Sequence, residues 1–200
     1  FPYTTLFRSI RGNLIGVQSN GLTASNLGNG RNGIKVSGGA SGINILNNIV
    51  CNNGIQDNKS NSSGICIETN GSTISNLIIS GNNIGVDKAY SKAGNIFAGL
   101  YLRVVSGGSI STVSLTNNVI GDNGNSAPNA NLHTGYSSGV AFLDCPNVNA
   151  TITGNYIGMT PSGGDIGNYH NGIELANTSG VVVGGTNTSL RNYFGYNKAN

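Results

Sequence analysis

Two aspartates come nearest to forming the paired carboxylates on which acid–base chemistry depends. Asp87 follows the segment Asn82-Asn83-Ile84-Gly85, and Asp122 follows the similar segment Asn118-Val119-Ile120-Gly121. Two facing carboxylates could hydrolyse a glycosidic bond, and an acidic cluster could hold Ca²⁺ in a polysaccharide lyase. Asp87 and Asp122 are therefore the candidate catalytic residues. The sequence otherwise predicts no metal and no cofactor, and Ca²⁺ at these two residues is the alternative that stays open.

Three tyrosines are candidates for binding rather than for catalysis. Tyr156 and Tyr193 each come directly after an asparagine in a related segment, and Tyr196 lies three residues beyond Tyr193. An exposed aromatic ring offers an apolar face with a polar tip, which suits the face of a sugar ring. The alternative is that these rings form an outer packing column. We expect a glycan contact at these tyrosines if they are exposed.

The three cysteines do not have the spacing of a metal site. Cys51, Cys66 and Cys145 form no Cys-x-x-Cys pair, and the two histidines, His133 and His170, lie in polar stretches away from them. A zinc site is therefore not expected. Cys51 and Cys66 could pair if the chain is secreted, or all three thiols could fill small buried sites.

The composition excludes several classes of protein. Only 8% of the residues are charged and the formal net charge is +3, so no basic field indicates a nucleic-acid partner. Glycine supplies 32 of the 200 residues, which disfavours a helical protein. The apolar runs are much shorter than the roughly 20 residues that cross a bilayer, so we expect no membrane span.

A repeat of about 35 residues organises the chain, as the signature Asn-x-Ile-Gly and its looser copies show. The apolar anchors of this signature are residues 15, 50, 84, 120, 157 and 194. Asparagine both tolerates turn geometry and can bond to identical neighbours in a stack. The sequence therefore predicts a ladder of six stacked asparagines: Asn13, Asn48, Asn82, Asn118, Asn155 and Asn192.

A second polar position follows each anchor by three residues. Its members share only a polar side chain of turn-forming type, which predicts a turn rather than a site: Gln18, Asn53, Asp87, Asn123, Thr160 and Asn197.

Each repeat contains three short segments of three to five apolar and β-branched residues with alternating character. Examples are residues 34–36, 43–45 and 49–50. Such segments are typical of strands. Three strands per repeat predict an all-β fold, a right-handed parallel β-helix of about five coils. The longest connections, such as 17–32 and 159–171, are Gly/Asn/Ser-rich loops where a solenoid could bind a ligand.

Residues 1–9, with the sequence FPYTTLFRS, differ from everything that follows them. They resemble the conceptual translation of a common sequencing adapter and lack the Gly/Asn character of the repeat. We therefore interpret residues 1–9 as a non-native segment and residues 10–200 as a parallel β-helix fragment truncated at both ends.

The segments Gly28-Asn29-Gly30-Arg31-Asn32-Gly33-Ile34 and Gly167-Asn168-Tyr169-His170-Asn171-Gly172-Ile173 resemble repeats of large secreted bacterial β-helix proteins. The wider architecture is similar to the pectin-lyase-like solenoids. The resemblance implies an extracellular or cell-surface location. Signatures of the polygalacturonases and of calcium-binding β-rolls are absent from the sequence.

We expect a non-catalytic, structural or adhesive segment of an exported protein, with polysaccharide or cell-surface glycan as its partner. The alternative is a polysaccharide lyase or glycoside hydrolase whose groove lies here or in a missing part. Solenoids without caps expose their end coils, so end-to-end self-association of this chain is also predicted.

Overall fold

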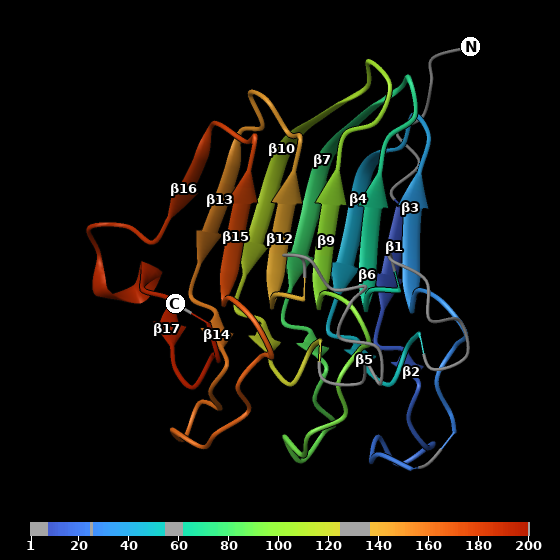
Figure 1. Ribbon diagram of the computed structural model, residues 1–200, viewed down its shortest axis with the longest axis vertical. Helices are drawn as coiled ribbons and strands as arrows, with labels where there is room; N and C mark the ends of the chain where they lie inside the picture. Colours follow the sequence, from blue (N-terminus) through green and yellow to red (C-terminus); the bar gives the residue numbers. More distant parts are fainter. Residues whose placement is uncertain (1–7, 25, 55–61, 125–136, 200) are drawn as a thin grey trace.

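The computed structural model of the chain describes residues 8–24, 26–54, 62–124 and 137–199. These residues form a parallel β-solenoid of about five coils, in which the chain passes through three sheets in each coil (Figure 1). The fold class predicted from the repeat is confirmed. Part of the adapter-like segment lies in the solenoid, because Arg8 and Ser9 begin the first strand and pair with Ile43 and Asn44. Residues 1–7 lie outside the described residues.

Sheet A contains the longest strands. Its members, in spatial order, are β1 (Arg8–Arg11), β4 (Ser41–Leu46), β7 (Thr73–Ser80), β10 (Ser109–Thr116), β13 (Ala150–Thr153) and β16 (Val181–Val183). β7 and β10 are eight residues long, more than the three to five that the alternation predicts. Asn76 and Thr112 explain the difference, because each has a φ of 54° and shifts the alternation by one residue within a continuous strand.

Sheets B and C complete each coil. Sheet B contains two-residue strands: β2 (Leu14–Ile15), β5 (Ile49–Val50), β8 (Asn83–Ile84), β11 (Val119–Ile120), β14 (Tyr156–Ile157) and β17 (Tyr193–Phe194). Sheet C contains β3 (Ile34–Ser37), β6 (Ile65–Glu68), β9 (Leu100–Arg103), β12 (Val140–Leu143) and β15 (Ile173–Ala176). A short 3₁₀ helix, η2 (Thr188–Leu190), lies between β16 and β17.

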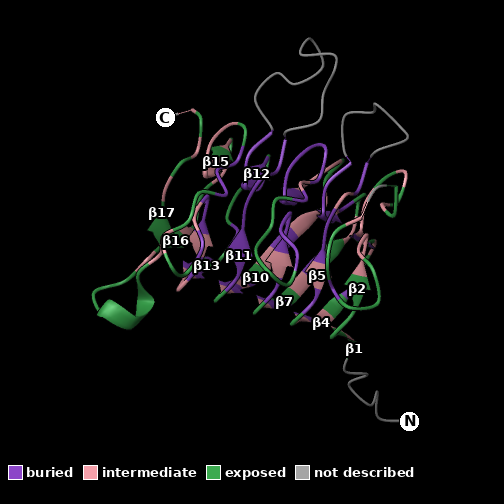
Figure 2. Cartoon of the chain, turned by 90° about the horizontal axis from the view of Figure 1, so that it is seen from below, coloured by how far each residue is buried: buried purple, intermediate pink, exposed green. Residues whose placement is uncertain are grey.

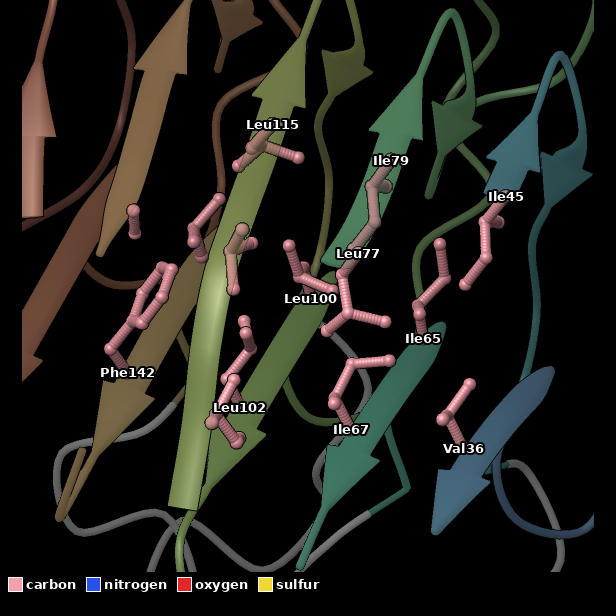
Figure 3. Close-up of a cluster of buried hydrophobic side chains, with 14 of the residues drawn as sticks. Val36, Ile45, Ile65, Ile67, Leu77, Ile79, Leu100, Leu102, Leu115 and Phe142 are labelled. Atoms are coloured by element: carbon pink, nitrogen blue, oxygen red, sulfur yellow. The ribbon is translucent and has the colours of Figure 1, made fainter. Parts of the chain in front are cut away.

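The core lies inside the coils and is almost entirely aliphatic (Figure 3). Equivalent residues stack from coil to coil, as in the row Ile45, Ile79 and Leu115 of sheet A, which are all fully buried. Burying each such side chain contributes about 1.5–3 kcal/mol, so the stacked rows supply most of the driving force for folding. Figure 2 shows the same arrangement, with burial concentrated in the middle coils and exposed residues at the C-terminal coil.

The predicted asparagine ladder is confirmed at the corner between sheets A and B. In every rung, the backbone N–H and the Nδ2 of one asparagine donate to the Oδ1 of the next, at 2.9–3.0 Å. From Asn48 to Asn192, Nδ2 also donates to a main-chain carbonyl of the preceding coil. A buried amide is costly unless it is bonded, and the ladder meets that requirement by stacking alone.

A second ladder of six asparagines lies between sheets B and C. Nδ2 of each member donates to Oδ1 of the next at 2.8–3.0 Å. The separations in sequence are 24, 42, 28, 45 and 29 residues. Its members are Asn29, Asn53, Asn95, Asn123, Asn168 and Asn197.

We number the coils 1 to 6 by their sheet B strands β2, β5, β8, β11, β14 and β17, and the sixth coil has no sheet C strand in the described residues. The irregular separations arise because successive coils alternate between two types. In coils 1, 3 and 5 a loop precedes the second-ladder asparagine: residues 16–28, 85–94 and 158–167, which we call the sheet B loops. In coils 2, 4 and 6 the asparagine follows sheet B directly, and in coils 2 and 4 the extra residues come after it. The structural repeat is therefore a pair of coils.

The pairing of coils corrects the prediction of one polar turn position three residues after each anchor. Asn53, Asn123 and Asn197 belong to the second ladder, whereas Asp87 and Thr160 begin sheet B loops. The coil type also explains why Cys51 replaces the signature glycine in coil 2. Gly16, Gly85 and Gly158 have positive φ in the odd coils, but Cys51 in coil 2 does not.

Candidate functional site

Asp87 stabilises the sheet B loops through its carboxylate. Its Oδ1 accepts N–H groups of Ala89 at 2.8 Å and Ser91 at 2.9 Å within its own loop. Its Oδ2 accepts the N–H of Thr23, in the loop two coils away, at 3.0 Å. The residue is 1% exposed, so both oxygens are occupied by backbone groups and turned away from solvent. This geometry gives Asp87 a structural role.

Asp122 lies in the next coil and bonds to the other end of the same loop. Its Oδ2 accepts the N–H of Gly94 at 2.9 Å, and its own N–H donates to the carbonyl of Ile166 at 2.7 Å. Asp122 has a φ of 57°, close to the values of Asn52 and Tyr196 at the equivalent place in coils 2 and 6. The two candidate carboxylates thus lie in neighbouring coils, but Asp87 holds the start of loop 85–94 and Asp122 holds its end.

Tyr156 and Tyr193 are register partners on sheet B, and their rings stack with centroids 4.8 Å apart and planes 9° from parallel. The predicted column therefore exists. Tyr156 packs against the buried cluster of Val86, Val119 and Ile166, while Tyr193 is 44% exposed. The pair is therefore partly a packing column and partly exposed surface, and the glycan contact stays a prediction.

Tyr196 lies outside that column, at the turn after β17. Its hydroxyl donates to the carbonyl of Gly163 in loop 158–167 at 3.1 Å, and 55% of the residue is exposed. A further exposed ring, Tyr169, has the Lys198 ammonium 4.9 Å from its centroid. The sequence analysis did not single out Tyr169, because the equivalent position of the related segment 28–34 is Gly30 and no column of aromatic residues marks it. Tyr193 and Tyr196 are the candidate tyrosines with the most open faces.

The sheet B loops form one side of the molecule, at the bottom of Figure 1. Loops 85–94 and 158–167 each close on a short antiparallel bridge, Val86 with Lys92 and Met159 with Asp165. Lys92 Nζ then lies 3.3 Å from Asp165 Oδ1, which joins the two loops across an intervening coil. The loops that the sequence offered for binding therefore stack on one another along the solenoid.

A row of alternating charges on the outer side of sheet C was not predicted. Lys35 Nζ lies 2.9 Å from Glu68 Oε2, and the hydrogen bond from this ammonium to Glu68 raises the pKa of Lys35. Arg103 is the register partner of Glu68, and its Nε lies 3.9 Å from Asp144 Oδ2. A comparison of carboxylates alone could not find this row, because two of its four members are cations.

An open cleft of about 470 Å³ lies beside this row. Its lining combines the Lys35–Glu68 pair with neutral polar and small residues: Lys35, Ser37, Gly38, Glu68, Thr69, Asn70 and Val105. Among residues 8–199 that the structure describes, no three His, Cys, Asp or Glu side chains gather closely enough to hold a metal ion. The Ca²⁺ alternative at Asp87 and Asp122 stays a prediction.

The three cysteines are free and buried, so the possible Cys51–Cys66 pair does not form in this structure. Burial raises the pKa of Cys66 to about 12 and that of Cys145 to about 11. Burial also raises the pKa of Cys51, with a smaller contribution from the charge of Asp87. These thiols are protonated at neutral pH and behave as small apolar side chains.

No protein-family model, curated protein or solved structure matches this chain. Within the described part of the chain, no helix is long and apolar enough to cross a membrane.

Proposed function

We propose that this chain is a non-catalytic, structural and adhesive segment of an exported or cell-surface protein, and that its exposed tyrosines contact glycans. The observation that carries the glycan contact is the Tyr156–Tyr193 stack, whose outer ring is 44% exposed. The rigid coils fix that ring, so little side-chain entropy is lost when a sugar packs on it. The exported location and bacterial origin rest on the resemblance to secreted β-helix repeats.

The test uses a glycan array and affinity electrophoresis with substitutions taken from other coils of the same chain. Tyr193→Ile introduces isoleucine, the residue type that coil 2 has in this column at Ile49. Tyr196→Asn introduces asparagine, the residue type at the equivalent Asn52, whose φ of 54° is close to the 57° of Tyr196. Both variants remove a ring without changing the backbone geometry. The control is Tyr90→Asn in loop 85–94, another exposed tyrosine with positive φ.

We expect Tyr193→Ile and Tyr196→Asn to weaken glycan binding by at least about tenfold, a loss of about 1.4 kcal/mol, with the control unchanged. An array without signal for the unmodified chain, or equal binding by all three variants, would show that the tyrosines are not a glycan site.

A polysaccharide lyase or glycoside hydrolase is the second candidate, and the charged row on sheet C favours it. Glu68 and Asp144 lie on either side of Arg103 on one outer face, which is where a glycan chain could cross the coils. Depolymerisation of acidic and neutral glycans by the chain, abolished by Glu68→Gln or Asp144→Asn, would support the enzyme. If Asp122→Asn keeps its turnover in the same assay, the activity belongs to the outer face of sheet C and not to the sheet B loops.

Self-association end to end is proposed from the direction of the ladders. In both ladders the donors face the next coil, so Asn13 and Asn29 present amide oxygens at one end, and Asn192 and Asn197 present N–H groups at the other. Phe194 and Val183 extend core rows to that second end and are 48% and 45% exposed. β16 and β17 of one copy could pair with β1 and β2 of another.

Such a contact joins two different surfaces and does not close on itself, so it produces filaments. Light scattering should give a mass that rises with protein concentration, and Phe194→Lys should keep the chain monomeric. A sharp monomeric peak at high concentration for the unmodified chain would contradict this proposal.

A further inference from the structure

The outer face of sheet A is rich in hydroxyl groups. Strands β4, β7, β10, β13 and β16 contain no charged and no aromatic residue, and the charged residues of this sheet, Arg8 and Arg11, lie in β1 at its N-terminal edge. Their outward positions are mostly hydroxyl-bearing: Ser41, Thr73, Ser75, Ser80, Ser109, Ser111, Ser114, Thr116, Thr151 and Thr153. We call this surface the hydroxyl face.

The hydroxyls lie in rows, because the strands pair in register. One row contains Ser80, Thr116 and Thr153, and another contains Ser41, Ser75 and Ser111. Neighbours in a row are separated by the strand spacing of about 4.8 Å. The repeat is therefore fixed along the rows, whereas along β7 and β10 the positive-φ residues Asn76 and Thr112 separate the row of Ser75 and Ser111 from the central row of Ile78, Ser114 and Thr151.

The hydroxyls of the array are held in place by one another. Thr116 Oγ1 donates to Ser80 Oγ at 3.0 Å, and Ser75 Oγ donates to Ser41 Oγ at 3.2 Å. Thr73 Oγ1 and Ser109 Oγ lie 2.9 Å apart. A hydroxyl has one donor and two acceptor sites, so each member can still bond to water. Ordered waters bound to fixed polar groups lose little further entropy when they join a lattice.

We propose that the hydroxyl face binds ice. A surface that orders water on a rigid array of comparable repeat can adsorb to a growing ice front, because that water layer joins the crystal. The lack of charge favours this occupant, since an ionic side chain would hold water in an orientation that an ice lattice does not accept. Exposed apolar groups on this face, such as Ile78, form no hydrogen bond with water, so the water molecules beside them bond to one another.

A crystalline polysaccharide is the competing ligand for a flat face. Such a ligand would be expected to stack its sugar rings on aromatic side chains. The five strands of the hydroxyl face contain none, whereas the tyrosines that the structure describes lie on sheets B and C and in loops. The ice proposal is therefore independent of the glycan contact proposed above, and either can fail without the other.

The test measures thermal hysteresis and inhibition of ice recrystallisation by the 200-residue chain. Ser114→Lys and Thr151→Lys place charges on register partners at the centre of the hydroxyl face. Each should abolish most of the hysteresis, whereas Ser114→Thr, which keeps the hydroxyl, should retain it. Ser37→Lys is the matched control, because Ser37 is an exposed strand residue on sheet C. Circular dichroism establishes that each variant is folded.

Three outcomes would overturn the proposal. The first is an unmodified chain that leaves ice growth as it is in buffer. The second is full activity in folded Ser114→Lys and Thr151→Lys proteins. The third is sedimentation with microcrystalline cellulose or chitin that the same two substitutions abolish, without any effect on ice, which would assign the hydroxyl face to a polysaccharide.

Discussion

Asp87 and Asp122 bind opposite ends of one loop, although they come from successive coils. Asp87 accepts N–H groups of Ala89 and Ser91 at the start of the loop, and Asp122 accepts the N–H of Gly94 at its end. The loop is thereby fixed to the coil that begins it and to the coil that follows. Carboxylates are scarce in this chain, and these two serve the backbone of the sheet B loops.

Removing the Asp87 carboxylate should destabilise the protein. Asp87→Ala leaves the N–H groups of Ala89, Ser91 and Thr23 without their acceptor, so we expect a loss of about 2–3 kcal/mol in the free energy of unfolding. Guanidinium denaturation measures the loss. Asp165→Ala is the control, because that side chain is 57% exposed and should cost less than about 1 kcal/mol. Equal losses would show that Asp87 does not hold the loops.

Asp122→Asn should be nearly neutral. Asparagine keeps an oxygen for the Gly94 N–H and tolerates positive φ, and Asn52 already occupies the equivalent position in coil 2. We expect a change below about 1 kcal/mol in the free energy of unfolding. A much larger loss would indicate that the negative charge itself is required at this turn.

The two ladders should be equally sensitive to truncation. Asn118→Ala and Asn123→Ala each break a rung and leave buried N–H groups of the preceding coil unbonded, with an expected cost of about 3 kcal/mol. Asn117→Gly is the control, since Asn117 has a φ of 56° and Gly81 and Gly154 occupy its place in adjacent coils. Thermal unfolding of the three variants measures the loss of stability that each causes. A tolerated Asn123→Ala would mean that only the first ladder stabilises the fold.

Two glycines test close approach and backbone angle separately. A Cβ at Gly99 would lie 2.7 Å from both Asn123 Nδ2 and the Gly139 carbonyl oxygen, so Gly99→Ala should cost about 3 kcal/mol. Gly107 has a φ of 74° and open space around it, so Gly107→Ala should cost only about 1–2 kcal/mol. The comparison uses denaturant midpoints of the two variants. The reverse order would contradict the tight packing beside the second ladder.

The buried thiols should make stability fall at alkaline pH. The pKa of Cys66 rises from 9.0 to about 12 on folding, because burial disfavours the thiolate. Above pH 9 the unfolded chain loses this proton while the native chain keeps it, so the stabilisation is complete below pH 9 and lost as the pH rises toward 12. Denaturation at pH 8 and pH 10 measures the change, which Cys66→Ala should reduce.

The thiol reagent DTNB provides a second measurement of the same burial. At pH 8 the native chain should react at the rate of unfolding, and the unfolded chain should react at once. Rapid reaction of the native chain would show that the thiols are accessible.

Local residue types determined the repeat, and with it the fold and the first ladder. The asparagines of that ladder are 35, 34, 36, 37 and 37 residues apart, because the extra residues lie before the second-ladder asparagine in one coil and after it in the next, so the total length of a coil stays nearly constant. Apolar anchors at such constant spacing can be buried together only by stacking. The pairing of Tyr156 with Tyr193 followed from the same constancy.

Where a loop of variable length intervenes, only the tertiary structure determined which residues of successive coils become neighbours. The second ladder joins residues 24 to 45 apart, because loops lie before its asparagine in one coil and after it in the next. In the row of Lys35, Glu68, Arg103 and Asp144, strand register pairs Glu68 with Arg103, and ion pairs add Lys35 and Asp144 from the coils on either side. The hydroxyl face likewise becomes continuous only when Asn76 and Thr112, with positive φ, bring Ser75 and Ser111 into line. Spacing in sequence specifies such neighbours only where the intervening chain has a fixed length.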